Sequence, residues 1–189
     1  MNYLAHAYLS KEDEGLLIGN FIADHLRGNK FDHLSEGIKK GIVLHRQIDT
    51  FTDQHASFKR SKRLFYKGFE RYSGVLVDIY FDHFLASNFS FHHHKTLPEF
   101  TEEVYSVYQN NIHLLPENSN KFLGYVLQNN IYHAYGNIQG IEKVLFHLSH
   151  RIGHDVMLNE SVKLFNTNKS ALQENFEVFM KDVKKEFLS

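Results

Sequence analysis

Four short segments in the first half of the chain place histidine and aspartate among large apolar residues. They are NYLAHAYLS at 2–10, GNFIADHLRG at 19–28, GIVLHRQIDTFTD at 41–53 and VLVDIYFDHFLASNF at 75–89. Nitrogen and oxygen donors suit manganese, magnesium, iron or zinc, and carboxylate-rich sets favour manganese or magnesium. The chain has no cysteine, which excludes thiolate metal sites, disulfides and a cysteine nucleophile. Because a bound cation lowers the pKa of water and polarises a phosphoryl oxygen, the pattern predicts metal-assisted hydrolysis.

The segment at 75–89 is the most informative of the four. Apart from two aspartates and one histidine, its first turns are large and apolar on every side, which is typical of a buried helix. Aspartate is almost never buried without a partner, and Asp78 and Asp82 lie one turn apart on one face. A divalent cation would remove the repulsion between them. In the alternative, the two carboxylates form salt bridges to arginines such as Arg27 or Arg46.

The segment at 41–53 carries His45, Asp49 and Asp53 at four-residue spacing. On a helix of 3.6 residues per turn these three side chains share one stripe, offset from an apolar stripe. A histidine and an aspartate four residues apart on a helix can bind one ion together. In the alternative, the stripe is solvated and Asp53 belongs to the end of the helix, because aspartate favours turns.

The two remaining segments each offer one polar side chain in apolar surroundings. Asp24 is surrounded by apolar residues, and its alternative role is to cap the following turn or to pair with Arg27. His6 is the only strongly polar side chain near the centre of its segment. A single histidine on an apolar face can also be a hydrogen-bonded core residue. Considered together, the four segments predict one site built from several helices.

A basic segment follows the predicted site at 58–72, with six basic residues and one acid. Its candidate partner-binding residues are Lys59, Arg60, Lys62, Arg63 and Lys67. Phenylalanines at helical spacing would bury the opposite side of this helix. A local patch of this kind steers an acidic macromolecule toward the site. In the alternative, it is an ordinary solvated face.

Length and composition limit the class of protein. The chain has 189 residues, 42% of them hydrophobic and 23% charged, with a net charge of −1. This predicts one domain with a substantial core and gives no reason to expect a nucleic-acid partner. No apolar run approaches the roughly 18 residues needed to cross a bilayer, and the first residues lack the features of a signal peptide. We therefore expect a cytoplasmic protein without a membrane partner.

The elements that must position these residues are helices. Apolar residues recur at three- and four-residue spacing, and turn-forming clusters separate the periodic stretches. The predicted helices span about 2–10, 14–27, 35–54, 56–72, 74–90, 98–113, 119–135, 138–150, 154–166 and 169–188. The sequence therefore predicts a single all-α domain over 1–189, a helical bundle. Its metal site lies in 1–90, and the helices of 98–188 support it.

The motifs resemble those of a known family, the acyl carrier protein phosphodiesterases. The resemblance rests on NYLAH at 2–6, GNFIAD with RG at 19–28, GI with HRQID and TD at 41–53, and D with DHFL at 78–85. It covers roughly residues 2–90, and it is fainter over 120–151. It implies an enzyme that hydrolyses the phosphodiester between 4′-phosphopantetheine and the serine of holo acyl carrier protein. It also implies a helical, HD-domain-like fold and dependence on manganese, with magnesium or iron as other possible ions.

The resemblance also implies roles for individual residues. The metal candidates are His6, Asp24, His45, Asp49, Asp78 and Asp82. The catalytic candidates are Asp24, His45, Asp49, Asp82 and His83, with His25 as another group that could move a proton. Arg27 and Arg46 are candidates for phosphate binding, because guanidinium binds phosphate oxygens in pairs. The basic segment would dock the carrier protein, which is small and acidic.

Two other functions stay open from the sequence. The first is an HD-type phosphohydrolase that acts on a nucleotide or another small phosphorylated ligand, with no docking role for the basic segment. The second is a non-catalytic helical interaction protein whose acids are neutralised by salt bridges.

Overall fold

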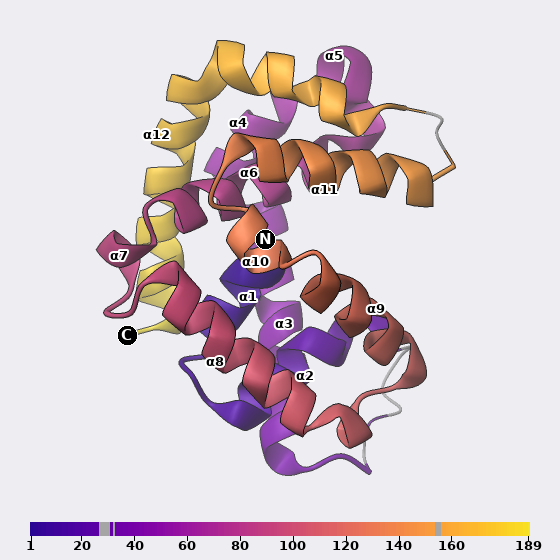
Figure 1. Cartoon of the computed structure of the whole chain (residues 1–189). Helices are drawn as coiled ribbons and strands as arrows, with labels where there is room; N and C mark the ends of the chain where they lie inside the picture. Colours follow the sequence, from indigo (N-terminus) through magenta and orange to yellow (C-terminus); the bar gives the residue numbers. More distant parts are fainter. Residues whose placement is uncertain (27–30, 32, 154–155) are drawn as a thin grey trace.

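The computed structural model describes residues 1–26, 31, 33–153 and 156–189, and within these ranges the chain is helical with no strand. The first half contains α1 (Tyr3–Leu9), α2 (Glu14–Ile22), the 3-10 turn η1 (Ala23–His25), α3 (Glu36–Gln54), α4 (Ala56–Arg63), α5 (Tyr66–Phe69), η2 (Glu70–Tyr72), α6 (Ser73–Ser87) and α7 (Phe89–His92). The second half contains α8 (Leu97–Asn110), η3 (Ile112–Leu114), α9 (Glu117–Gln128), α10 (Ile131–Ala134), α11 (Ile138–Arg151), η4 (Leu158–Ser161) and α12 (Val162–Phe187). The predicted all-α bundle is confirmed (Figure 1).

Helix α6 lies at the centre of the bundle, as its apolar sequence predicts. It contacts α1 and α4 from the first half and α11 and α12 from the second half. Tyr80 of α6 stacks against Phe165 of α12, with ring centroids 4.4 Å apart, and against Phe65 on its other side. These rings join the two halves of the chain in one continuous core. No helix among the described residues is long and apolar enough to cross a bilayer.

Helices α2 and α3 approach each other closely because glycines line their contact. A Cβ atom added to Gly19 would lie 2.0 Å from the carbonyl oxygen of Ile38, and one added to Gly41 would lie 2.6 Å from the carbonyl oxygen of Leu16. Any larger side chain would therefore separate the two backbones. The residues one turn further along each helix are brought within direct side-chain reach, and His45 is among them.

Several helix boundaries follow from local chemistry. The Asp13 side chain accepts from the backbone N–H of Leu16 at the start of α2, and the Ser35 side chain does the same for Ile38 at the start of α3. Thr96 and Glu99 form a capping box at the start of α8. Each cap satisfies backbone donors that the first turn of a helix leaves free.

The helix predicted over 56–72 is wrong in its second half. Lys67 has an extended backbone and Gly68 has a φ of 94°, so the chain breaks between α4 and η2. A positive φ of this size is available to glycine at little cost. The predicted helix at 119–135 is interrupted in the same way by Asn130, whose φ is 42°.

The helices predicted over 154–166 and 169–188 share one helix, α12, from Val162 to Phe187. Of the first prediction, residues 154–155 lie outside the described residues and Leu158–Ser161 form the 3-10 turn η4. Residues 162–187 contain neither glycine nor proline, and the polar side chains at the expected break do not end the helix. Thr167 and Asn168 instead bond back to the carbonyl oxygens of Lys163 and Leu164, one turn earlier.

The likeness of the whole fold to HD domains stays a prediction.

Candidate metal centre

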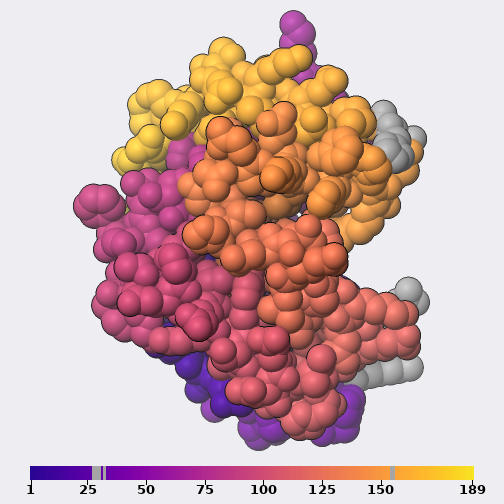
Figure 2. All heavy atoms as spheres, in the orientation of Figure 1, coloured from indigo at the N-terminus to yellow at the C-terminus, as the bar shows by residue number. Residues whose placement is uncertain are grey.

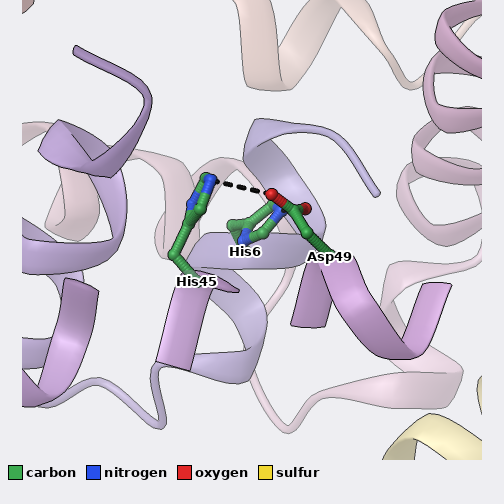
Figure 3. Close-up of side chains that lie close together, drawn as sticks. All are labelled: His6, His45 and Asp49. Atoms are coloured by element: carbon green, nitrogen blue, oxygen red, sulfur yellow. Dashed lines mark ion pairs between the residues drawn. The ribbon is translucent and has the colours of Figure 1, made fainter. Parts of the chain in front are cut away.

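Four of the predicted metal ligands converge from three separate helical segments. Figure 3 shows three of them, His6, His45 and Asp49. His6 comes from α1, Asp24 from η1, and His45 and Asp49 from α3. The Nε2 atom of His45 lies 3.0 Å from an oxygen of Asp24 and 3.1 Å from one oxygen of Asp49. The other oxygen of Asp49 lies 3.3 Å from Nε2 of His6. The two histidine rings stack, with centroids 4.3 Å apart.

The side chain of Asn20 fixes the orientation of both histidines. Its Oδ1 atom lies 2.8 Å from Nδ1 of His6 and 3.0 Å from Nδ1 of His45. Its Nδ2 atom donates to the carbonyl oxygen of His6 and to the hydroxyl of Ser10. This network assigns the oxygen of Asn20 to the side of the rings, so both Nδ1 atoms carry a proton. The Nε2 atoms therefore both point toward the carboxylates.

This arrangement fits a divalent cation. In neutral histidines protonated on Nδ1, the Nε2 atoms are acceptors, and they face carboxylates that are acceptors too. The contacts are favourable only when positive charge lies between them, from a proton or from a metal ion. One ligand atom each of His6, His45 and Asp49 lies within 4.8 Å of the others, and bonds from metals to nitrogen or oxygen are about 2 Å long. Histidine ligands are commonly fixed in this way through their second nitrogen.

The titration properties of the cluster agree with its need for positive charge. Burial by itself lowers the pKa of His45, but the carboxylates of Asp24 and Asp49 outweigh burial and raise this pKa to about 9. Burial lowers the pKa of His6, and its hydrogen bond to Asp49 offsets only part of that effect. Burial raises the pKa of Asp49, but its hydrogen bonds to His45 and His6 outweigh burial and hold this pKa well below its ordinary value.

The cluster forms part of the wall of an open cavity of about 330 Å³. The wall also contains Thr52 and Asp53 from the end of α3, and Asp78 from α6. The hydroxyl oxygen of Thr52 is buried and has no hydrogen-bond partner among the residues that the structure describes. Asp53, which the sequence left undecided between a site and a turn, therefore lies at the cavity.

Asp78 and Asp82 are not part of the cluster formed by His6, His45 and Asp49. Asp78 pairs with the amino group of Met1, 2.7 Å away. Asp82 is fully buried, and its Oδ2 atom accepts from the backbone N–H groups of Leu4 and Ala5 at 2.8 and 3.4 Å. It therefore supports the first turn of α1, the helix that carries His6. Burial raises the pKa of Asp82 to about 7. The ligand role of both aspartates stays a prediction.

The two candidate proton carriers differ in their surroundings. His83 is buried, and its Nδ1 atom lies 2.8 Å from the carbonyl oxygen of Tyr135. It does not line the cavity. His25 follows Asp24 directly, is only partly buried, and contacts the ring of Phe122. His25 does not line the cavity either, but it is adjacent in sequence to Asp24, which does.

The predicted phosphate-binding arginines are not both at the cavity. Arg27 lies outside the described residues. Arg46 is exposed on α3, and its guanidinium lies over the ring of Phe31 at 5.2 Å. It lines a separate groove with residues of α3 and the end of α12. The arginine that does line the metal cavity is Arg151, at the end of α11. The sequence assigned it no role.

The basic segment begins on α4, just after the part of α3 that lines the cavity. Lys59 and Arg63 are exposed there, and so is Lys67 in the following turn. Arg60 is exposed too, but it donates to Asn175 of α12 and to Ser57 of its own helix. Lys62 is half-buried and lies 5.9 Å from the ring centre of Phe58.

Sequence reasoning missed two residues that matter for the geometry. Asn20 carries the only uncharged polar side chain of α2, whose sequence is EGLLIGNFI, and it is 2% exposed. A buried amide in an apolar helix needs partners, and that signal could have identified it. Arg151 carried no comparable signal, since it ends a long amphipathic helix in the half of the chain that was expected to give only support.

Comparisons with known proteins complete the description of the site. The sequence matches the family described as acyl carrier protein phosphodiesterase over residues 1–183. A protein of that name from Serratia proteamaculans is 30% identical over 80% of this chain and 79% of its own length. One from Salmonella dublin is 28% identical over 93% and 92%, and one from Pectobacterium atrosepticum is 38% identical over 46% and 45%. No solved structure matches the chain. The chain belongs to the acyl carrier protein phosphodiesterase family.

Proposed function

We propose that this chain is a metal-dependent phosphodiesterase that hydrolyses the bond between 4′-phosphopantetheine and the serine of holo acyl carrier protein. The products are the apo carrier protein and free 4′-phosphopantetheine. The observation that carries this proposal is the convergence of His6, His45 and Asp49 at one cavity in a member of this family. The ion we propose is manganese, with magnesium or iron as alternatives, because the donors are nitrogen and oxygen.

The proposed ligands are the two histidines through Nε2 and the carboxylate of Asp49, with the carboxylate of Asp24 beside them. Asn20 keeps both Nδ1 atoms protonated, so that the Nε2 lone pairs stay available. When bound, the ion supplies positive charge to phosphoryl oxygens and lowers the pKa of a water molecule. Asp78 is proposed as a further ligand, because it lines the same cavity.

The other side chains at the cavity bind phosphate and move protons in this proposal. The guanidinium of Arg151 binds phosphate oxygens and stabilises the charge that develops on them. The carboxylate of Asp24, which is 47% exposed, accepts the proton of the attacking water, a role open to it only while it is not a ligand. A neighbouring imidazole, for which we favour His25, returns a proton to the leaving serine oxygen.

The basic segment is the proposed docking surface for the carrier protein. Lys59, Arg63 and Lys67 are exposed, and their segment follows the end of α3, where Thr52 and Asp53 line the cavity. Positive charge at this position would raise the rate of encounter with an acidic partner and orient it. Arg60 contributes less in this proposal, because its donors are already bonded within the chain.

The direct experiment is to incubate the protein with holo carrier protein and Mn²⁺ and to measure the carrier's mass. Loss of the 4′-phosphopantetheine mass is the expected result, and the Asp49→Asn variant should not produce it. An Asp182→Asn variant, which changes an exposed aspartate of α12 that pairs with His55, serves as the matched control. If the carrier mass stayed constant while nucleotides were hydrolysed, the HD-type nucleotide phosphohydrolase would be the better description.

A further inference from the structure

A second cavity opens directly beside the metal cavity. Its volume is about 260 Å³, and five residues line both cavities. The shared residues are Asn2, Tyr3, Ile79, Leu148 and Arg151. The two cavities therefore lie next to each other and share part of their walls. Figure 2 shows this face of the molecule hollowed between α11, in orange, and α9, in salmon.

The walls of the two cavities differ in chemistry. The metal cavity contains the acids and histidines described above. The second cavity has no acid among its lining residues. Its own walls are apolar and aromatic side chains with one imidazole at the edge. These residues are Phe122, Tyr125, Ile131, Tyr135, Val144 and His147. Such a wall favours a ligand that is largely apolar and makes a few polar contacts.

A ligand that occupies both cavities must carry an anionic centre joined to an elongated and mostly apolar chain. The arm of 4′-phosphopantetheine is an uncharged chain on a phosphate. The phosphate is followed by a methylene, a carbon bearing two methyl groups and a carbon bearing a hydroxyl, and then by two amides and a terminal thiol. Arg151 lies where the two cavities join. A phosphate bound there would contact the guanidinium while its chain enters the apolar side.

The two parts of the proposed substrate, the arm and the carrier protein, would face different walls of the site. The apolar cavity leaves the metal site past Tyr3 and Leu148, whereas Thr52, Asp53 and Val75 line the metal cavity alone. Helix α4, which carries the first part of the basic segment, begins three residues after Asp53. The carrier protein and the arm can therefore extend from the phosphate toward different walls of the site. A cavity of this size also suits a narrow chain and not a helix of a partner, whose diameter is about 10 Å.

We propose that the apolar cavity is the subsite for the pantetheine arm and that Arg151 binds the phosphate at its entrance. The assignment rests on the proposed function, because the arm belongs to that substrate. It adds what the family does not specify, namely which residues of this chain hold the prosthetic group.

The test uses two variants that reduce the cavity, each with a matched control. Val144→Phe adds bulk inside it, and Val178→Phe makes the same change at a position that is 49% exposed on α12. His147→Trp narrows the edge of the cavity from an exposed position, so folding should be preserved. His150→Trp is its control on the same helix, outside the cavity lining. Circular dichroism and thermal unfolding verify that each variant is folded.

The first measurement is binding by calorimetry in the presence of Mn²⁺, with inorganic phosphate and 4′-phosphopantetheine as the two probes. In the wild type and both controls, 4′-phosphopantetheine should bind more tightly than phosphate, because the arm occupies the cavity. In Val144→Phe and His147→Trp this advantage should fall by roughly tenfold or more. Retention of the full advantage in both folded variants would overturn the assignment.

The second measurement separates this proposal from the proposed function. We compare kcat/KM for holo carrier protein with kcat/KM for bis(p-nitrophenyl) phosphate, a diester that has no arm. The ratio should fall by roughly tenfold or more in the two cavity variants and stay constant in the controls. If the wild type does not release the prosthetic group but the variants lose the binding advantage, the subsite stands and the proposed reaction is wrong. If the wild type releases the prosthetic group, and the variants change neither the binding advantage over phosphate nor the ratio of kcat/KM values, only the subsite is wrong.

Discussion

The amide oxygen of Asn20 lies 3.0 Å from Nδ1 of His45. The same oxygen also accepts from His6, so one side chain of α2 sets the tautomer of two histidines that belong to two other helices. The Nδ1 atom of each histidine thus bonds to a residue of a different helix. The metal-binding geometry that we propose therefore depends on a residue that cannot itself reach the ion.

Replacing Asn20 with leucine should weaken metal binding without removing a proposed ligand. The change leaves the Nδ1 protons of His6 and His45 without an acceptor and frees both rings to rotate. Loss of such a supporting residue typically weakens affinity by about 10–100-fold. Calorimetric titration with Mn²⁺ measures this. Asn166→Leu, at an exposed position of α12, should bind Mn²⁺ like the wild type.

Removal of a proposed ligand should have a larger effect. In Asp49→Asn, His6 loses its carboxylate partner, His45 keeps only Asp24, and the cluster loses a negative charge. We expect the variant to retain no Mn²⁺ after desalting and to show no rise in melting temperature when Mn²⁺ is added. Elemental analysis and thermal unfolding provide the two readings. A variant that still bound one equivalent of Mn²⁺ with wild-type affinity would exclude Asp49 as a ligand.

Metal affinity should rise with pH. In the metal-free protein the pKa of His45 is raised to about 9 by Asp24 and Asp49, against the effect of burial. The cation must displace that proton, so below pH 9 the apparent affinity should increase by about tenfold per pH unit for one proton released. Titrations with Mn²⁺ at pH 6.5, 7.5 and 8.5 test this. A flat profile would mean that His45 is not the group displaced.

The stability of the metal-free protein should follow the opposite trend. The folded pKa of His45 lies above its ordinary value of 6.5. The ion pairs therefore contribute stability that is complete below about pH 6.5 and is lost as the pH rises through about 9. Urea unfolding in EDTA across this range should show a falling free energy of unfolding. In the His45→Gln variant this part of the decline should disappear.

Two substitutions of Asp82 distinguish a residue that supports helix α1 from one that binds the metal ion. Asp82→Asn keeps an oxygen that can accept from Leu4 and Ala5, whereas Asp82→Ala leaves buried N–H groups unpaired, at a cost of about 1–3 kcal/mol. If its role is to hold α1, Asp82→Asn should retain Mn²⁺ and activity, and Asp82→Ala should be less stable. Equal loss of Mn²⁺ in both folded variants would instead favour a ligand.

The same substitution has a pH signature. Burial raises the pKa of Asp82 to about 7 from 3.8, so the folded protein keeps this proton to a higher pH than the unfolded chain does. The resulting stability is present at low pH and is lost as the pH rises from about 4 to 7. Asp82→Asn should remove that part of the pH dependence and should be at least as stable as the wild type at pH 8. Urea unfolding at pH 5 and pH 8 measures the difference.

Charge reversal in the basic segment should affect the carrier protein and not small diesters. Lys59→Glu with Arg63→Glu should raise KM for holo carrier protein and flatten its dependence on salt, because both side chains are exposed on the proposed docking surface. Hydrolysis of bis(p-nitrophenyl) phosphate should change little. Lys181→Glu with Lys185→Glu on α12 gives the same change in net charge elsewhere. Equal effects of the two pairs would remove the docking role.

The sequence by itself determined the fold class and identified several of the residues that converge at the cavity. Helical periodicity gave the all-α bundle, and the apolar surroundings of His6, His45 and Asp49 marked them as residues with a role. Both inferences depend on patterns within a few turns of one helix. The same local reasoning failed at Gly68 and Asn130, where left-handed backbone conformations interrupt stretches that are periodic on either side.

Only the tertiary structure decided which polar groups meet. The contact of α2 with α3 at Gly19 and Gly41 brings Asn20 to both histidines, and the packing of α6 against α1 gives Asp82 a backbone partner. Arg151 reaches the cavity from a helix more than a hundred residues beyond His45. These pairings depend on how helices distant in sequence pack, and side-chain spacing along one helix carries no information about them.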